Sequence, residues 1–296
     1  MRLGFIGLGS IGMPMALNFF KGGHTLVVHD IDRGRGDRFV SEGAHWARSP
    51  KDVAASCDIL FTSLPGPRQV EQVITGPDGA INGLARGSLW VDLTTSDIAV
   101  TQKLSDLLFA RGVISLDAPI TGGIAKAYEG TITIYVSGEK RAYERVRPVL
   151  KLTAEHVPYL GALGNATIVK LITNALAMAH VIALGEGLVL GKKLGIDEKV
   201  LLEAIKVSYA DSFVARIDGP DILSGDYGTS FAAALACKDL VLSLDLAREH
   251  GIELPAIRLT HDLYQAARAE FGDSSAANNA VRQLERRSGV SLSGQQ

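Results

Sequence analysis

The sequence predicts an α/β protein with two parts: an N-terminal parallel sheet wound on both faces by helices, and an all-helical second half that starts with a long connecting helix. Short apolar runs alternate with helical patterns over residues 1–160, which is typical of βαβ units. Runs such as Asp58–Phe61 are almost entirely apolar, as expected for strands covered on both faces. After about residue 162 strand-like runs stop, and apolar residues recur at helical spacing.

The predicted elements follow this alternation. The expected strands are Leu3–Ile6, Thr25–His29, Ile59–Ser63, Leu89–Asp92, Ile114–Asp117 and Thr131–Ser137. Helices are expected between several of them, at Pro14–Lys21, Arg68–Ile74 and Ala99–Arg111. The second half is expected to form helices at Thr167–Lys193, Glu198–Val207, Leu235–His250 and Ala256–Phe271. The last residues, from Arg286 to Gln296, are expected to form a frayed polar tail.

Composition bounds the class of protein. With 296 residues, of which 47% are hydrophobic, the chain can bury a core and is long enough for about two domains, which we place at 1–162 and 163–296. The formal net charge of −2 is unlike that of a dedicated nucleic-acid binder. Two cysteines, Cys57 and Cys237, do not suffice for a disulfide framework or a zinc site, and no metal is expected.

The longest apolar stretch does not predict a membrane span. It runs from Leu176 to Leu190 and is interrupted by His180 and Glu186, so it falls short of the roughly 20 apolar residues that a span requires. The residues after Met1 lack the apolar region of a secretory signal. We therefore expect a cytoplasmic protein with no membrane partner.

A glycine motif predicts a dinucleotide site. It follows the first expected strand, opens a helix with Met13 and Pro14, and fits G-x-G-x-x-G with Gly7, Leu8, Gly9, Ser10, Ile11 and Gly12. In this motif the first glycine permits a tight turn, the second lets the backbone approach a pyrophosphate, and the third allows close packing of helix on strand. The alternative is a glycine turn without a ligand.

Asp30 is expected to select the cofactor. It ends the second strand, 18 residues beyond Gly12, where a carboxylate binds the ribose hydroxyls and repels a 2′-phosphate. Arg33 and Arg35 follow closely and could instead pair with that phosphate. We predict NAD, with NADP as the alternative.

Later strand ends supply further candidates. Leu64-Pro65 and Thr94-Thr95 follow two expected strands, and ligands of doubly wound sheets bind at these carboxyl ends. Ordinary turn and helix-cap chemistry explains the same residue types equally well.

Three segments are candidates for a reaction site. Thr121-Gly122-Gly123 follows the fifth expected strand and offers a hydroxyl and two unhindered amides to a carboxylate, or is simply a glycine-rich loop. Lys170 and Asn174 lie four residues apart on one face of an apolar helix, where a lysine either reaches solvent or is held in a cleft. Lys238-Asp239-Leu240 starts another helix and could be only a surface ion pair.

Together these segments resemble the β-hydroxyacid dehydrogenase family, which includes 3-hydroxyisobutyrate dehydrogenases and tartronate semialdehyde reductases. The resemblance spans nearly the whole chain and rests on four motifs in the family's order. These are the stretch from Gly7 to Asn18, the stretch from Asp117 to Gly123, the segment from Gly161 to Asn174, and Lys238-Asp239-Leu240.

The resemblance implies a fold and a role for each motif. The family fold is a Rossmann domain, a long connecting helix and a helical domain that dimerises. Lys170 corresponds to the catalytic lysine, and Asn174 to a substrate-holding group, which in the expected reaction would orient Lys170 or the substrate. Thr121, Gly122 and Gly123 correspond to substrate-holding groups, and Lys238 to a lysine that closes over cofactor and substrate. The dinucleotide contacts implied are Gly7 to Met13, Asp30, Leu64, Pro65, Gln69, Thr95 and Lys238.

The chain departs from the family pattern at three places, with Thr121 for the more common serine, Ala166 for a glycine and Val241 for a glycine. None removes a reacting group, but the substrate stays open. The related imine reductases usually lack the lysine that stands here at position 170.

We expect reversible hydride transfer between NAD and a short 3-hydroxy acid such as 3-hydroxyisobutyrate. The alternatives are tartronate or succinic semialdehyde, a 3-hydroxy amino acid such as serine, or a non-catalytic dinucleotide-binding protein. The stretch 209–213 and Phe231 are expected to line part of the pocket, and a homodimer or homotetramer is expected.

Overall fold

The chain forms two compact units. The structure, a computed structural model, describes residues 1–228 and 231–293. The first unit is Met1–Lys170 and the second is Leu171–Gln296. Helix α8 (Asn165–Lys193) begins in the first unit and continues through the second.

The first unit is built on a seven-stranded sheet with the order β3-β2-β1-β4-β5-β6-β9. All neighbouring strands in it are parallel except the pair β6 and β9. The first six strands have the order of a doubly wound dinucleotide-binding fold, which reverses direction between β1 and β4. The strands are β1 (Arg2–Ile6), β2 (Thr25–His29), β3 (His45–Trp46), β4 (Ile59–Thr62), β5 (Leu89–Asp92), β6 (Ile114–Asp117) and β9 (Ser137–Gly138). The predicted fold class is confirmed.

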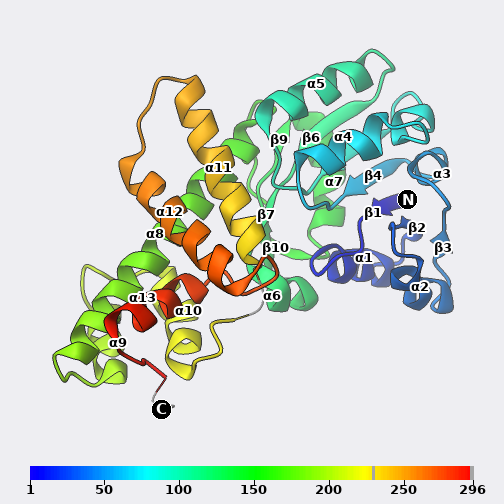
Figure 1. Cartoon of the computed structure of the whole chain (residues 1–296). Coiled ribbons are helices and arrows are strands. Elements are labelled where there is room, and N and C mark those ends of the chain that lie inside the picture. Colours follow the sequence, from blue (N-terminus) through cyan, green and yellow to red (C-terminus); the bar gives the residue numbers. More distant parts are fainter. Residues whose placement is uncertain (229–230, 294–296) are drawn as a thin grey trace. The chain divides into compact units, whose positions relative to one another are not determined.

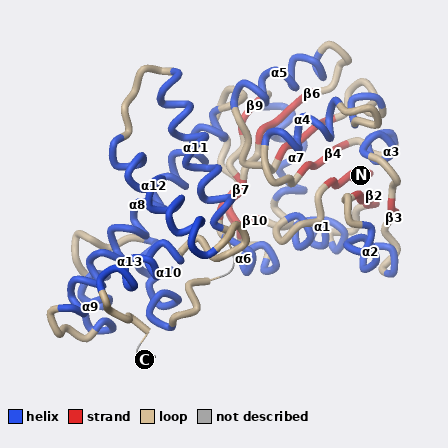
Figure 2. The backbone as a smooth tube through the Cα atoms, viewed as in Figure 1, coloured by secondary structure: helices blue, strands red, loops and turns tan. Residues whose placement is uncertain are grey.

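Helices cover both faces of this sheet (Figures 1 and 2). One buried cluster joins the sheet to α1 (Gly12–Lys21) and α7 (Lys140–Leu150). A second joins the other face to α3 (Pro50–Ala55), α4 (Pro67–Thr75) and α5 (Ile98–Phe109). Two short helices, α2 (Asp37–Ser41) and α6 (Gly123–Glu129), complete the unit. Helices α2, α3, α6 and α7 were not expected from the sequence.

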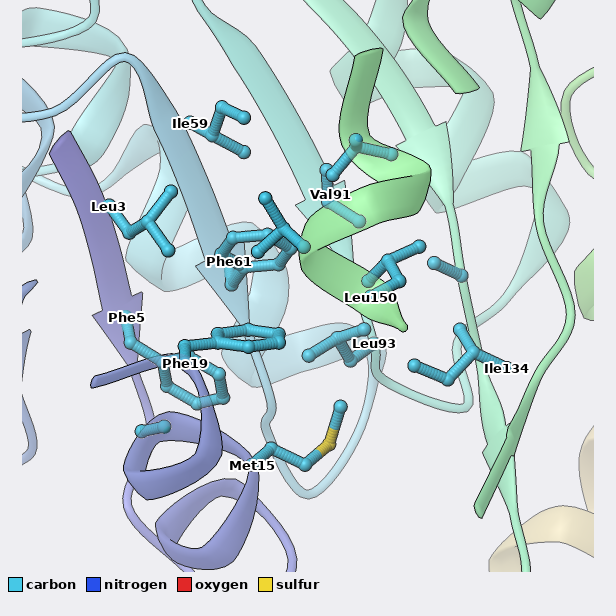
Figure 3. Close-up of a cluster of buried hydrophobic side chains, with 14 of the residues drawn as sticks. Leu3, Phe5, Met15, Phe19, Ile59, Phe61, Val91, Leu93, Ile134 and Leu150 are labelled. Carbon is cyan, nitrogen blue, oxygen red and sulfur yellow. The ribbon is translucent and has the colours of Figure 1, made fainter. Parts of the chain in front are cut away.

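Alternation along the strands explains why both faces are apolar. Phe5 of β1 and Phe61 of β4 are register partners on the face that carries α1, and both are fully buried. Phe19 of α1 packs on them, with its ring centroid 4.8 Å from that of Phe61 and 6.0 Å from that of Phe5. Figure 3 shows the three rings directed toward one another. This contact fixes α1, and therefore the preceding glycine loop, against the sheet.

The single strand expected at Thr131–Ser137 is wrong. The structure has two strands there, β8 (Ile132–Ile134) and β9, in different sheets. β8 lies between β7 (Ile120–Thr121) and β10 (Ala154–His156) in a small three-stranded sheet, whereas β9 closes the edge of the large one. Between them Tyr135 and Val136 donate backbone hydrogen bonds to Pro119 and Pro158. A continuous apolar pattern gives no sign of such a change of sheet.

Every element of the second unit that the structure describes is a helix (Figure 2). They are α8, α9 (Glu198–Lys206), α10 (Phe213–Ser224), α11 (Ala233–Glu249), α12 (Pro255–Phe271) and α13 (Asn279–Ser288). Of these, α10 and α13 were not expected.

The frayed tail is also wrong for most of its length. Arg286–Ser288 are helical, and Leu292 is fully buried. The Leu292 amide donates to Glu285 Oε1 over 2.6 Å. Residues 294–296 lie outside the described residues. One buried apolar residue anchors this segment, and it is too short a signal to recognise in a polar stretch.

The apolar segment Leu176–Leu190 was expected to be too short to span a membrane, but it belongs to a longer helix, α8. It has 29 residues and a mean hydropathy of 1.7 over 18 residues, so by length and composition alone it could cross a membrane. His180 and Glu186 interrupt the apolar run without ending the helix. About 44% of that window is buried, however, and Met178 and Leu188 belong to the cores of the second unit. A single helix of this kind is weak evidence for a membrane span.

Candidate active site

The glycine loop joins β1 to α1 at the strand-order reversal. Gly7 has φ +97°, and its amide donates to the His29 carbonyl over 3.0 Å. A Cβ at Gly7 would lie 2.2 Å from the Ser63 carbonyl oxygen, and one at Gly12 would lie 1.9 Å from the Gly7 carbonyl oxygen. Both glycines are therefore required by the fold itself, as the motif predicts for its turn and helix-packing positions.

Gly9 differs from its two neighbours in the motif. The nearest atom to a Cβ built there is an Arg35 guanidinium nitrogen, at 3.7 Å. Its φ lies outside the left-handed region, so neither packing nor conformation requires glycine. Ser10 beside it is exposed. A loop with room for a Cβ at Gly9, directly before the N-terminus of α1, fits a ligand phosphate.

Asp30 follows β2 and holds the glycine loop. Its Oδ2 accepts the Leu8 amide over 2.6 Å, and its Oδ1 accepts the Asp32 amide over 2.9 Å. Arg35 reaches the same loop, with a guanidinium N–H 3.3 Å from the Leu8 carbonyl oxygen. Asp30, the candidate cofactor selector, and Arg35, one of the competing arginines, thus both contact the glycine loop at Leu8.

A buried polar network follows β4 and β5. Asp92 Oδ1 accepts hydrogen bonds from the Thr62 hydroxyl (2.8 Å) and the Thr94 amide (3.1 Å). Thr94 Oγ1 in turn accepts the Leu64 amide over 3.1 Å. Burial raises the pKa of Asp92 to about 6, although the hydrogen bonds from Thr94 and Thr62 oppose the shift. The network fixes the loop that carries the candidate contact Leu64.

The other candidate nucleotide contacts near these strands are accessible. Pro65 and Gln69 are exposed, and Leu64 and Thr95 are half-buried. Gln69 lies in the first turn of α4.

The candidate carboxylate-binding turn follows β6. Thr121 ends β7 and is half-buried, while Gly122 and Gly123 are exposed at the start of α6. Both glycines have positive φ, +131° and +80°. The turn therefore depends on glycine at both positions.

Lys170 lies in the second turn of α8 and is only 7% exposed. This contradicts the interpretation of a lysine that reaches solvent. The start of α8 is bound by Asp117 at the end of β6, whose Oδ2 accepts both the amide (2.9 Å) and the hydroxyl (3.1 Å) of Thr167.

Asn174 lies one turn further along α8 and is bound within the second unit. Its amide nitrogen donates to Asp239 Oδ2 of α11 over 2.7 Å. The Lys238 ammonium lies 2.9 Å from Asp239 Oδ1, and Asp239 is 2% exposed as a residue. The ion pair of Lys238 with Asp239 is thus half-buried, with a carboxylate that also holds Asn174. Asp239 was not among the candidate site residues, although it belongs to one of the motifs.

Comparison with known proteins decides the family. Residues 2–161 match the family described as the NAD binding domain of 6-phosphogluconate dehydrogenase. Residues 164–284 match the one described as the NAD-binding part of NADP-dependent 3-hydroxyisobutyrate dehydrogenase. The chain is 33% identical to 2-(hydroxymethyl)glutarate dehydrogenase of Eubacterium barkeri over 100% of its own length and 98% of the relative's. The chain belongs to the β-hydroxyacid dehydrogenase family.

Two further members support the assignment. The 2-hydroxy-3-oxopropionate reductase of Escherichia coli K12 is 30% identical, over 96% of this chain and 97% of its own. The crystallised 3-hydroxyisobutyrate dehydrogenase of Mycobacterium tuberculosis, studied with L-serine, has a TM-score of 0.88 at 26% identity and covers 96% of this chain and 98% of its own. The resemblance drawn from four sequence motifs is confirmed, as is the class of NAD(P)-dependent oxidoreductase.

The glycine loop fits the dinucleotide that this family binds. The loop has two glycines that the backbone requires and a third at which a Cβ would make only an ordinary van der Waals contact. Residues from Gly7 to Met13, together with Asp30, would hold the cofactor. Within 1–228 and 231–293 no group of three or more His, Cys, Asp or Glu side chains is placed to bind a metal ion.

Sequence reasoning assigned no role to Asp117 or Asp239. Both are charged residues inside family motifs, both are 2% exposed, and both accept hydrogen bonds from residues on or next to α8. Asp117 ends an apolar strand and Asp239 lies among the apolar positions of a helix. Because acidic residues are rarely buried without a partner, these positions could have indicated a role for both.

Proposed function

We propose that this protein is an NAD-dependent dehydrogenase of 2-substituted 3-hydroxypropanoates, with Lys170 as the general acid and base. The observation that carries the proposal is a lysine only 7% exposed in the second turn of α8, within the family motif. Burial of a lysine is expensive unless a partner or function compensates for it.

The substrate class follows from chemistry shared by the relatives' names. Hydroxymethylglutarate, 3-hydroxyisobutyrate and serine all contain HO–CH2–CH(R)–COO⁻, and 2-hydroxy-3-oxopropionate is the aldehyde of the same skeleton. Only R differs between them. The carboxylate would bind at Thr121, Gly122 and Gly123, whose backbone is exposed at the two glycines.

When bound, the nicotinamide exchanges a hydride with the carbinol carbon. The Lys170 amine would accept the hydroxyl proton during oxidation and return it to the aldehyde oxygen during reduction. As an ammonium, Lys170 also stabilises negative charge on that oxygen, since a fixed donor is worth a few kcal/mol there. Asn174 would orient Lys170 or the substrate, and Lys238 would close over cofactor and substrate.

The first experiment is oxidation of a panel of acids with NAD⁺ and NADP⁺ in parallel: 3-hydroxyisobutyrate, 3-hydroxypropionate, glycerate, 4-hydroxybutyrate, serine, threonine and 2-(hydroxymethyl)glutarate. Succinic semialdehyde and tartronate semialdehyde test the reductive direction. Turnover of a member with the shared skeleton supports the proposal. NADH binding without turnover of any panel member contradicts it and favours a non-catalytic dinucleotide-binding protein.

Replacement of Lys170 tests the mechanism. We expect Lys170→Ala to lower kcat by about 10²- to 10⁴-fold, the range of general acid–base catalysis, with the Kd for NADH nearly unchanged. Lys21→Ala, at an exposed lysine in the last turn of α1, is the control. Turnover by Lys170→Ala within about tenfold of wild type would contradict the role of Lys170.

Replacement of Asp30 tests the cofactor preference. Asparagine has a single acceptor oxygen where aspartate has two. Asp30→Asn therefore loses one charge-assisted hydrogen bond to the ribose, worth about 1.5–3 kcal/mol, and it no longer repels a 2′-phosphate. We expect the affinity for NADH to fall about ten- to a hundredfold and that for NADPH to fall less. Titration of both nucleotides by fluorescence measures this, with Asp32→Asn as the exposed control; equal losses for both would remove the assignment.

The finer organisation is also proposed. Residues 1–162 would form the dinucleotide-binding domain and 163–296 the substrate and dimerisation domain of a cytoplasmic homodimer or homotetramer. Large apolar side chains exposed on the second unit support association, namely Ile172, Leu176, Leu190, Phe213, Ile217 and Leu259. Light scattering of the purified protein gives the oligomeric state, and a monomer at micromolar concentration would contradict it.

A further inference from the structure

A row of buried polar side chains crosses the large sheet near the carboxyl ends of its parallel strands. Thr62 of β4, Asp92 of β5, Asp117 of β6 and Ser137 of β9 are successive register partners. All four are at most 2% exposed. Because paired residues of neighbouring strands share a face, the row is continuous, and hydrogen bonds join Thr62 to Asp92 and Ser137 to Asp117.

One end of this row binds the N-terminus of α8. Asp117 accepts four hydrogen bonds: from Ser137 Oγ, from the Gly164 amide (3.0 Å), and from the amide and hydroxyl of Thr167. Ser137 Oγ accepts the Ala166 amide over 2.9 Å. Two of the amide groups that the first turn of a helix leaves unpaired, those of Ala166 and Thr167, are thus bound by side chains of the sheet.

This attachment determines where Lys170 lies. Lys170 is three residues beyond Thr167, so its Cα lies about 4.5 Å further along the helix axis. Because no further helical turn separates Thr167 from Lys170, a shift or fraying of the first turn of α8 displaces Lys170 as well. We propose that Asp117, together with Ser137, is a positioning residue that holds Lys170 in its reactive place; this rests on the proposed role of Lys170.

The pattern of donors predicts which substitution is harmful. The donors of Asp117 occupy both carboxylate oxygens, so the amide nitrogen of Asp117→Asn would face a backbone N–H in either orientation, that of Gly164 or that of Thr167. Asp92 accepts the Thr62 hydroxyl and the Thr94 amide at Oδ1, and it also accepts a hydrogen bond from the Thr94 side chain. Because a hydroxyl can accept as well as donate, the amide nitrogen of Asp92→Asn can face the Thr94 side chain without leaving two donors opposed. The same substitution one strand away, at equal burial, is therefore a matched control.

The test compares Asp117→Asn, Asp92→Asn and Lys170→Ala. Hydrogen exchange followed by mass spectrometry reports on residues 164–168, and steady-state kinetics uses the best acid of the panel. For Asp117→Asn we expect faster exchange there and a ten- to a hundredfold fall in kcat, because a misplacement of about 1 Å costs about a hundredfold. The KM for NAD⁺ should change less than about threefold. Asp92→Asn should keep wild-type exchange at 164–168, and this exchange is the quantity for which it serves as the control.

Two outcomes would overturn the proposal. Retention of kcat in a folded Asp117→Asn, while Lys170→Ala is inactive, makes Asp117 a helix anchor only. An equal increase of exchange at 164–168 in Asp92→Asn would assign the effect to any buried carboxylate. If Lys170→Ala itself keeps its turnover, the proposed function fails instead.

A second pair of variants covers the case in which Asp117→Asn does not fold. Thr167→Val removes one donor to Asp117 and retains the shape of the side chain, whereas Thr167→Ser retains the hydroxyl. We expect a severalfold lower kcat for the valine variant and near wild-type kcat for serine. Equal kcat values for the two would contradict the proposal.

Discussion

The glycine loop offers a prediction that separates folding from ligand binding. The perturbation is a single methyl group, introduced as alanine at Gly9, at Gly12 or at Gly7. At Gly12 it would lie 1.9 Å from a backbone oxygen, and at Gly7 2.2 Å from another, with φ +97° in addition. At Gly9 the nearest atom is 3.7 Å away and belongs to the flexible Arg35 side chain.

The expected magnitudes follow from these distances. Overpacking costs about 1–3 kcal/mol, so Gly12→Ala and Gly7→Ala should both lower the free energy of unfolding. Gly9→Ala should leave it unchanged or raise it by up to about 1 kcal/mol, because alanine restricts the unfolded chain. The methyl group would nevertheless occupy the place of a phosphate. Loss of one charge-assisted hydrogen bond, about 1.5–3 kcal/mol, lowers the affinity for NADH about ten- to a hundredfold.

Urea unfolding and calorimetric NADH titration of the three variants measure the two quantities independently. The decisive variant is Gly9→Ala, for which we expect full stability and weak binding. Wild-type affinity for NADH in folded Gly9→Ala would refute the reasoning, since the room for a Cβ at Gly9 would then have no connection with the dinucleotide. A loss of stability as large as that of Gly12→Ala would refute it as well.

Two further predictions concern stability. The pKa of Asp92 is raised from 3.8 to about 6 in the folded state, so the native state binds this proton more tightly than the unfolded chain. The contribution of Asp92 to the free energy of unfolding therefore falls by about 3 kcal/mol as pH rises from 3.8 through 6. In urea titrations, the stability of Asp92→Asn relative to wild type should rise by a similar amount between pH 4 and pH 7. A difference that stays constant with pH would contradict the pKa shift. Leu292 is fully buried, so Leu292→Ala should lower the free energy of unfolding by about 2–5 kcal/mol. Val207→Ala, at an exposed site, is the control. An equal loss of stability in the two variants would contradict anchoring of the C-terminal segment.

Most of the first unit could be predicted because its signals are local. The strands from β1 to β6 that matter for the site are short apolar runs, and the predicted Thr25–His29 and Leu89–Asp92 agree with the structure residue for residue. The glycine loop is equally local, since its spacing and its flanking strand and helix lie within about twenty residues. Helix α7 was missed because charged residues and Pro148 dominate it and only four of its residues are buried.

The contacts that organise the candidate site were not predictable from the sequence, because they join distant residues. Asp117 is 47 residues from Gly164 and 50 from Thr167. Asn174 is 65 residues from Asp239. Helical spacing predicts that Lys170 and Asn174 share one face of α8, but it does not predict which residues bind that helix. The structure supplies these partners, and with them the roles proposed for two aspartates.

Asp92 and Asp117 show how the surroundings divide one residue type into two functions. They are register neighbours with the same burial. Backbone N–H groups donate to both oxygens of Asp117, whereas Asp92 accepts one backbone amide and two threonine hydroxyls. Donors to both oxygens favour a carboxylate over an amide at position 117, and burial favours the protonated form at position 92. Since Asp117 and Lys170 belong to the same compact unit as the glycine loop, the proposed positions of the reactive lysine and the nicotinamide depend on one sheet.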